Sequence, residues 1–142
     1  MVIFVAMNLH EYQGKQLLEK FNVCIQKGYV ANTPEEAVEC AKKLSNETGT
    51  KIFVIKAQIH AGGRGKGGGV KIAKSLEDVK RISSEIIGMN LITPQTSAEG
   101  KLVRKVLVAE DVYYNGDSDR KEFYISVLLN RSSSKNMIVY ST

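Results

Sequence analysis

The chain has 142 residues, of which 43% are hydrophobic and 25% are charged. These proportions are typical of soluble globular domains and argue against a disordered or collagen-like chain. The net charge of +5 suits an anionic partner such as a nucleotide, coenzyme A, a nucleic acid or an acidic subunit, although an ordinary basic surface explains it equally well.

The chain begins with an apolar stretch, residues 1–6, ahead of a second methionine at Met7. This stretch is too short for the apolar region of a signal peptide or for a membrane span. We interpret residues 1–6 as a leader or extended start ahead of a domain that begins at Met7, with an extra edge strand as the alternative. Either interpretation favours a cytoplasmic bacterial protein without a membrane partner.

A first helix is predicted over about residues 9–21. Asn8 can cap its start, because a short polar side chain there satisfies a free backbone N–H. The spacing of Leu17, Leu18 and Phe21 indicates the face that this helix buries.

A short strand near Gly28–Ala31 precedes a second helix, which Thr33 and Pro34 begin as a cap and a first-turn proline. The continuous apolar run Ile52–Ile55 predicts a strand that is buried on both faces. Lys56 follows this run directly, so its charge needs an anionic ligand or an acidic partner.

A glycine cluster follows: six of the 12 glycines lie between Gly62 and Gly69, interleaved with Arg64 and Lys66. Such a loop lets consecutive backbone N–H groups approach phosphate oxygens. It is not a Walker A loop, because glycine rather than Ser or Thr follows its lysine. A strand at residues 70–74 follows where a dinucleotide-binding loop needs a helix. The order strand, glycine loop, strand predicts a phosphate-covering flap; a flexible hairpin tip and an RGG-like nucleic-acid segment are the alternatives.

The second half of the chain is rich in predicted strands. Ser75 caps a third helix, and strands are predicted at residues 106–112 and 123–129, with another beginning at Met137. Alternating apolar residues in the strand at 123–129 indicate one inward-facing row. The turn-forming cluster at 114–119 predicts that the first two of these strands pair as a hairpin.

Three segments resemble, in order, the β subunits of succinyl-CoA synthetase, also called succinate–CoA ligase. They are Met7–Lys15, Lys56–Val70 and the run from Asn130 to Thr142. The resemblance covers residues 7–142 and implies the N-terminal portion of an ATP-grasp fold, of α+β (α/β) class, in which the glycine loop is the phosphate flap. It also implies that a second lobe and a CoA-ligase domain lie beyond Thr142.

The resemblance implies a set of nucleotide-binding residues, carried over position by position: Lys56, Gly63, Arg64, Gly65, Glu110, Tyr113 and Glu122. Lys56 would contact a phosphate beneath the flap. Glu110 would lie by the base or hinge strand, Tyr113 would take the next contact position, and Glu122 would hydrogen-bond the ribose. Taken alone, each acid also fits a solvated strand residue. Gln26 falls where GTP-preferring relatives carry a glutamine near the base, and an ordinary polar surface residue is the alternative.

The activity that the resemblance implies is the reversible conversion of succinate, CoA and a nucleoside triphosphate to succinyl-CoA, nucleoside diphosphate and phosphate in the tricarboxylic acid cycle. ATP or GTP would be the nucleotide. Mg²⁺ would be held by residues beyond Thr142, so we expect no catalytic residue and no metal ligand in this chain. A partner α subunit, in a heterodimer or heterotetramer, would carry the phosphorylated histidine.

Two other functional classes remain open from the sequence. A malate–CoA ligase or an ATP-citrate lyase-like acyl-CoA ligase shares the same start and flap. A basic nucleic-acid-binding module is the alternative from a different class, although we expect no nucleic acid partner. On its own the chain is predicted to lack ligase activity.

Overall fold

The computed structural model describes residues 8–113 and 121–141. The chain forms two compact units, residues 1–112 and residues 113–142, and each is described here by itself. Residues 1–6 and the turn cluster at 114–119 lie outside the described residues, so the expectations for them stay predictions.

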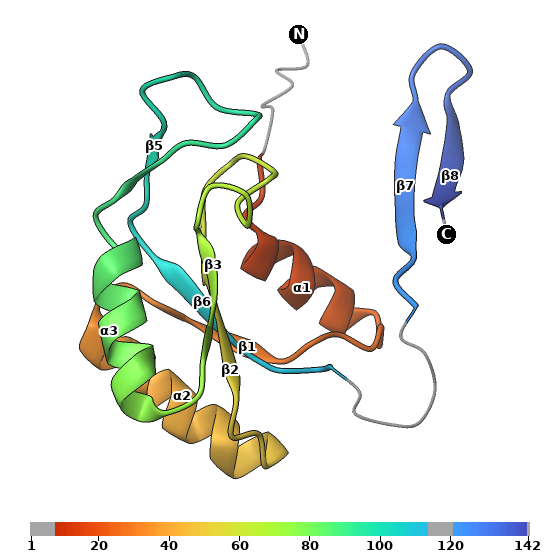
Figure 1. Ribbon diagram of the computed structural model, residues 1–142. Coiled ribbons are helices and arrows are strands. Elements are labelled where there is room, and N and C mark those ends of the chain that lie inside the picture. Colours follow the sequence, from red (N-terminus) through yellow and green to blue (C-terminus); the bar gives the residue numbers. More distant parts are fainter. Residues whose placement is uncertain (1–7, 114–120, 142) are drawn as a thin grey trace, which may run out of the picture. The chain divides into compact units, whose positions relative to one another are not determined.

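A four-stranded antiparallel sheet forms the centre of the first unit (Figure 1). Its strands, in spatial order, are β1 (Gly28–Ala31), β6 (Val106–Glu110), β2 (Phe53–Ala57) and β3 (Val70–Ala73). Lys56 of β2 therefore lies between Leu107 and Val70 on its two neighbours. The sheet places the end of β2, where the glycine loop begins, beside the strand that leads to Glu110.

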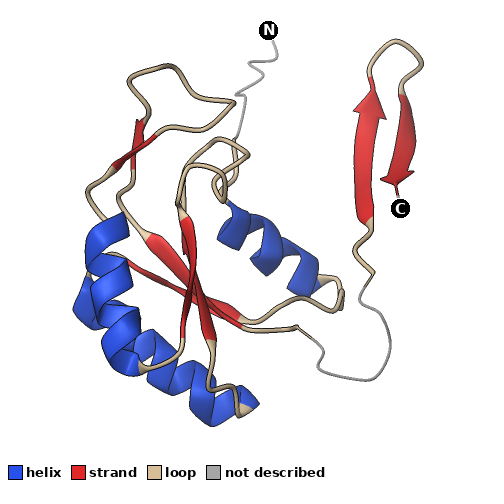
Figure 2. Ribbon diagram, in the orientation of Figure 1, coloured by secondary structure: helices blue, strands red, loops and turns tan. Residues whose placement is uncertain are grey.

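Two helices, α2 (Pro34–Thr48) and α3 (Leu76–Ile86), cover one face of the sheet, and α1 (Glu11–Lys20) lies on the other (Figures 1 and 2). The caps are those predicted: the hydroxyl groups of Thr33 and Ser75 accept hydrogen bonds from the third residue after each, at 3.1 Å. The core lies between α2, α3 and the sheet. Its helical members are Ala37, Ala41, Leu44, Val79, Ile82 and Ile86, and its sheet members include Phe53, Ile55, Val106 and Val108.

The prediction for the first helix was wrong about its buried face. No residue of α1 is buried, and the side chains of Leu17, Leu18 and Phe21 are 44%, 48% and 79% exposed. The helix instead directs polar and charged side chains at the sheet, where the ammonium group of Lys56 must be accommodated. The cap also differs, because His10 rather than Asn8 precedes the helix and its backbone N–H donates to Oε1 of Gln13 at 2.9 Å.

The strand β2 also departs from its prediction. It runs from Phe53 to Ala57, so that Lys56 lies inside it rather than after it. Only the face with Phe53, Ile55 and Ala57 is fully buried, because the α1 side of the sheet is less completely covered. This opening on the α1 side is where the candidate site lies.

A short strand pair, β4 (Asn90–Leu91) and β5 (Lys101–Leu102), was not predicted from the sequence. Its strands have only two residues each, which is too short for an alternation pattern to be recognised. The connection between them lies against the glycine loop, as described below. Within the part of the chain that the structure describes, no helix combines the length and apolar character needed to span a membrane.

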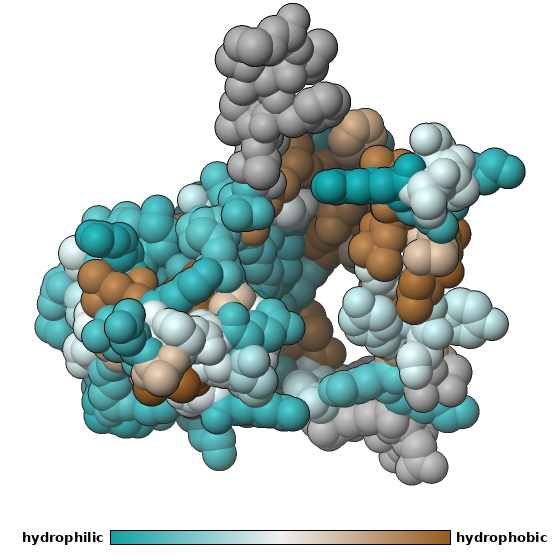
Figure 3. All heavy atoms as spheres, turned by 90° about the horizontal axis from the view of Figure 1, so that it is seen from above, coloured by the Kyte–Doolittle hydropathy of each residue, from teal (hydrophilic) through white to brown (hydrophobic). Residues whose placement is uncertain are grey.

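The second unit is a hairpin of β7 (Tyr124–Asn130) and β8 (Lys135–Ser141). The predicted pairing of the 106–112 strand with the 123–129 strand was therefore wrong. Both edges of β6 are occupied by β1 and β2, which leaves no edge for β7. The predicted inward row is exposed, because a two-stranded hairpin cannot bury a face by itself. Hydrophobic side chains accordingly gather on the hairpin surface (Figure 3).

Candidate functional site

Three cationic side chains from three elements converge on the carboxylate of Glu11. Oε2 of Glu11 lies 2.7 Å from Nη2 of Arg64 in the glycine loop. Oε1 lies 3.5 Å from Nζ of Lys56 on β2 and 3.5 Å from Nζ of Lys15 on α1. These side chains are only about one-fifth exposed, at 18–22%. The cluster carries three positive charges and one negative charge, so it attracts an anion.

Burial by itself would raise the pKa of Glu11. The charge of Lys56, the hydrogen bond and charge of Arg64 and the charge of Lys15 outweigh burial and lower the pKa to about 2. Glu11 is therefore ionised at neutral pH.

The depressed pKa of Glu11 makes the stability of the fold depend on pH. In the unfolded chain this carboxyl has a pKa near 4.5, so its contribution is complete well above that pH and is lost as the pH falls toward 2. We expect Glu11 to contribute about 3 kcal/mol to the free energy of unfolding at pH 7 and about 1 kcal/mol at pH 3. Urea unfolding of the wild type and Glu11→Gln at both pH values measures this, and a difference independent of pH would contradict it.

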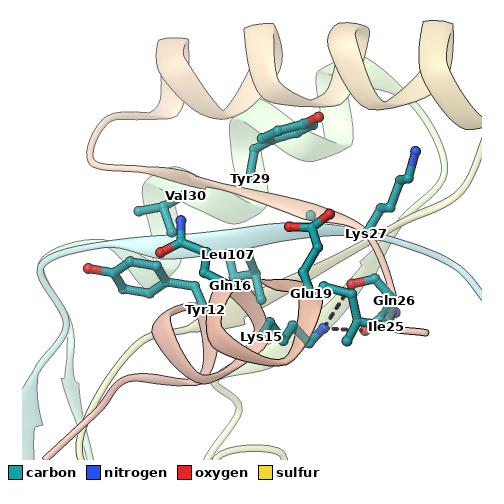
Figure 4. Close-up of a pocket in the computed structure, with 11 residues that line it drawn as sticks. Tyr12, Lys15, Gln16, Glu19, Ile25, Gln26, Lys27, Tyr29, Val30 and Leu107 are labelled. Atoms are coloured by element: carbon teal, nitrogen blue, oxygen red, sulfur yellow. Dashed lines mark hydrogen bonds between the residues drawn. The ribbon is translucent and has the colours of Figure 1, made fainter. Parts of the chain in front are cut away.

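Gln26 joins Lys56 to the end of β6. Its Oε1 accepts hydrogen bonds from Nζ of Lys56 at 2.7 Å and from Nζ of Lys15 at 3.1 Å, the latter visible in Figure 4. Its Nε2 donates to the backbone oxygen of Glu110 at 2.5 Å, and Oε1 of Glu110 accepts from the backbone N–H of Lys27 at 2.8 Å. Lys56, Gln26 and Glu110, which are far apart in sequence, are thus brought together.

A pocket of about 240 Å³ lies between α1 and the sheet beside these residues (Figure 4). Tyr12 and Gln16 of α1 line it on one side, and Val30 and Leu107 line it on the sheet side. A wider cleft of about 650 Å³ includes Arg64 at the start of the glycine loop. Open space therefore adjoins the cationic cluster on the α1 side of the sheet.

The glycine loop has the predicted position between two antiparallel strands, β2 and β3. It is folded onto itself, since the backbone N–H of Gly69 donates to the oxygen of Arg64 at 2.8 Å and that of Gly68 donates to Gly65 at 3.1 Å. Gly63 and Gly68 have φ values of 73° and 81°, which residues with a side chain rarely adopt.

Residues 91–95, which we call the supporting segment, lie directly against this loop. A Cβ atom at Gly67 would be 2.2 Å from the backbone oxygen of Ile92, and one at Gly69 would be 2.4 Å from a methyl group of Leu91. Oε1 of Gln95 accepts the backbone N–H of Gly62 at 2.6 Å. Several glycines are thus needed for packing within the protein, whereas the sequence had suggested the close approach of a ligand or a flexible hairpin tip.

Three consecutive backbone amides of the loop are available to bind a ligand. Among the described residues, the backbone N–H groups of Gly63, Arg64 and Gly65 have no hydrogen-bond acceptor. A Cβ atom at Gly65 would meet nothing within 4 Å, so this part of the loop borders open space. Consecutive open amides beside a cationic cluster are suited to binding the oxygens of a phosphate group.

The guanidinium group of Arg64 is held by the protein itself. Its Nη1 donates to the backbone oxygen of Ala57 at 2.7 Å and its Nη2 donates to Glu11. At the base of the loop the rings of His10 and His60 stack with centroids 3.9 Å apart. Burial, followed by the charges of His60, Lys105 and Arg64, lowers the pKa of His10. This stacked pair packs the start of α1 against the residues that lead into the loop.

The last two predicted site residues belong to the second unit. The hydroxyl group of Tyr113 and Oε1 of Glu122 lie 3.1 Å apart, so these two residues contact each other. Sequence reasoning gave Glu11 no role in the site, and it did not identify Lys15 or Gln95. The spacing of Glu11 and Lys15, which is typical of a helical ion pair, was the available signal, but it could not reveal Lys56 and Arg64.

The described residues do not form a metal site. Nowhere in residues 8–113 or 121–141 do three His, Cys, Asp or Glu side chains come close enough to hold a metal ion.

A family model described as the ATP-grasp domain matches residues 8–142. The chain belongs to the ATP-grasp family. The predicted ATP-grasp fold is thereby confirmed, whereas the phosphate-covering role of the glycine loop between β2 and β3 stays a prediction. Among solved structures, the ATP-grasp chain is similar to a dinucleotide-forming acetyl-coenzyme A synthetase 1 of Ca. Korarchaeum cryptofilum, with a TM-score of 0.63 and 20% identity. That match covers 94% of this chain and 52% of the other, and at this identity it supports the fold alone.

Curated relatives are much more similar in sequence. The chain is 69% identical over 136 residues to the succinate–CoA ligase (ADP-forming) subunit beta of Flavobacterium psychrophilum. It is 65% identical over the same length to the corresponding subunit of Christiangramia forsetii. Each alignment covers 96% of this chain and 34% of the relative, so the chain spans about a third of the length of these relatives. The resemblance noted from the sequence is confirmed.

Proposed function

We propose that this ATP-grasp chain is the part of a succinate–CoA ligase β subunit that holds the phosphates of a nucleotide. One observation carries the proposal: three open amides at Gly63, Arg64 and Gly65 lie in a loop tied to a cluster with excess positive charge. Backbone amides and a partly buried lysine together bind phosphate oxygens without requiring any particular base. The 69% identity to a named succinate–CoA ligase supports the reaction, which is succinate, CoA and nucleoside triphosphate to succinyl-CoA, nucleoside diphosphate and phosphate.

In this proposal Lys56 contacts a phosphate, and Gly63, Arg64 and Gly65 cover it. Glu110 lies by the base and Glu122 binds the ribose, with Tyr113 as its neighbour. Gln26 is suited to influence the choice of base because it bonds both Lys56 and the backbone of Glu110. The ADP-forming names of the relatives favour ATP, with GTP as the alternative.

The complete enzyme would need further parts. We propose that a second ATP-grasp lobe supplies the Mg²⁺ ligands, that a CoA-ligase domain follows it, and that an α subunit accepts the phosphoryl group. Such an enzyme would act in the tricarboxylic acid cycle in the cytoplasm. By itself the chain of residues 1–142 would bind nucleotide weakly and would lack turnover.

Replacing Gly65 with alanine tests the phosphate-binding role of the loop. The added methyl group meets no protein atom within 4 Å, so the fold should be unchanged, but it would obstruct a ligand that approaches the backbone. We expect NMR titration with MgATP to show shifts in the wild-type loop amides and about tenfold weaker binding by the variant, the equivalent of about one lost hydrogen bond.

Gly14→Ala is the matched control, because Gly14 also has no atom within 4 Å of its Cβ position and lies on α1. It should bind MgATP as the wild type does. Absence of any shift in the wild-type loop would overturn the proposal. A salt-dependent shift with oligonucleotides alone would instead favour the nucleic-acid-binding alternative.

A further inference from the structure

The side chain of Arg64 is used inside the protein. It spans from the glycine loop to two fixed points, the backbone oxygen of Ala57 at the end of β2 and the carboxylate of Glu11 on α1, each at 2.7 Å. A planar guanidinium group can make two such bonds in different directions, whereas an ammonium group acts as a single point charge. The loop is therefore tied by one side chain to a strand and to a helix.

Glu11 is itself held in place on several sides. It is the first residue of α1, and Nε2 of Gln58 lies 3.4 Å from its Oε2. Gln58 also accepts the backbone N–H of Tyr12 through its Oε1 at 3.3 Å, so the start of α1 is bonded to the residue that follows β2. The carboxylate is thus a rigid anchor and not a freely moving surface group.

The residue tied to Glu11 lies in the middle of the three open amides. The backbone N–H groups of Gly63, Arg64 and Gly65 have no acceptor among the described residues, and the side chain of Arg64, the middle residue of the three, is bonded to Glu11 and to Ala57. The backbone oxygen of Arg64 meanwhile accepts from Gly69, which closes the loop at its other end. The segment that carries the three open amides is therefore fixed at Arg64 by its side chain and by its backbone oxygen.

We propose that Glu11 is a positioning residue for the phosphate flap: through Arg64 it holds the loop in the shape that presents its three open amides, and its ion pair with Lys56 keeps that ammonium group in the same cluster. This inference rests on the proposed nucleotide-binding function. It assigns Glu11 no contact with the ligand, since a carboxylate would repel phosphate oxygens.

The direction in which nucleotide affinity changes when Glu11 loses its charge distinguishes this positioning role from a simple counter-ion role. If Glu11 were only a counter-ion competing with the ligand for Lys56 and Arg64, removing its charge would strengthen the binding of a nucleotide. If Glu11 positions the flap, the same change weakens binding even though the cluster becomes more positive. Preorganised donors bind an anion better than mobile ones because less ordering is required on binding.

The test compares MgATP titrations of the wild type, Glu11→Gln, Arg64→Lys and the double variant, followed by the loop amide signals in NMR spectra. We expect each single variant to bind about tenfold more weakly, because each breaks one charge-assisted contact of the flap. The double variant should be little worse than either single variant, since both act through the same contact. Amide hydrogen exchange at Gly69 should become faster in Glu11→Gln without nucleotide.

Arg64→Lys retains a positive charge opposite the Glu11 carboxylate. It therefore still tests the proposal if Glu11→Gln does not fold. Glu39→Gln is the matched control, because Glu39 pairs with Lys42 on the exposed side of α2. It should leave both nucleotide binding and exchange at Gly69 unchanged. Equal or tighter MgATP binding by Glu11→Gln or by Arg64→Lys would overturn the positioning role. A wild type that does not bind MgATP at all would instead overturn the proposed function.

Discussion

Replacing Lys56 with methionine is expected to weaken nucleotide binding by about 10- to 100-fold. Lys56 is the central cation of the cluster, and its side chain is only 18% exposed. An ion pair with phosphate at such a site is poorly screened by water, so its loss is costly. Methionine retains similar length and apolar contacts, which restricts the change to the charge.

The fold should tolerate this change, because Lys15 still bonds Gln26 and Arg64 still pairs with Glu11. Lys71→Met is the control: Lys71 lies on the neighbouring strand β3 and pairs with Glu85 at 2.7 Å on an exposed surface. Calorimetric or NMR titration with MgATP at fixed salt measures both variants. Equal weakening by the two changes would mean that net charge, and not the position of Lys56, determines binding.

Gly67→Ala is expected to lower the free energy of unfolding of the first unit by about 2–3 kcal/mol, the cost of overpacking a filled site. The new Cβ would lie 2.2 Å from the backbone oxygen of Ile92 and 2.8 Å from Cδ1 of Leu91. No real Cβ atom is found that close to a backbone atom, so the loop or the supporting segment must move. Leu91 belongs to the buried core, which limits how far that segment can shift.

Urea unfolding of Gly67→Ala measures this loss, and Gly65→Ala on the same loop is the internal control. We expect the Gly65 variant to unfold at the wild-type urea concentration and to bind nucleotide about tenfold more weakly. The Gly67 variant should lose stability whether or not nucleotide is present. Wild-type stability of Gly67→Ala would show that the loop does not rest on residues 91–95 in solution.

Local features of the fold were predictable from the sequence because neighbouring residues determine them. Thr33 and Ser75 cap their helices as expected, since each hydroxyl group bonds an amide three residues later. The first helix, which spans residues 11–20, was predicted at about residues 9–21, but its exposed apolar face was wrongly predicted to be buried. Periodicity assumes that a helix buries apolar residues, whereas α1 faces the sheet with polar groups around Lys56. The predicted pairing partner of β6 was wrong for a related reason: its actual partners, β1 and β2, are distant from it in the chain.

The amino-acid sequence by itself determined a glycine loop between two strands, the lysine that precedes it and the resemblance to an ATP-grasp protein. Each of these features is a contiguous pattern, so it can be recognised from neighbouring residues without knowing the tertiary structure. Only the tertiary structure decided that Glu11 anchors Arg64, 53 residues away, and that Gln95 bonds Gly62, 33 residues away. Such contacts depend on how β2, β6 and α1 are brought together. The partner of a charged or polar side chain is determined by its neighbours in space, and these are not its neighbours in the sequence.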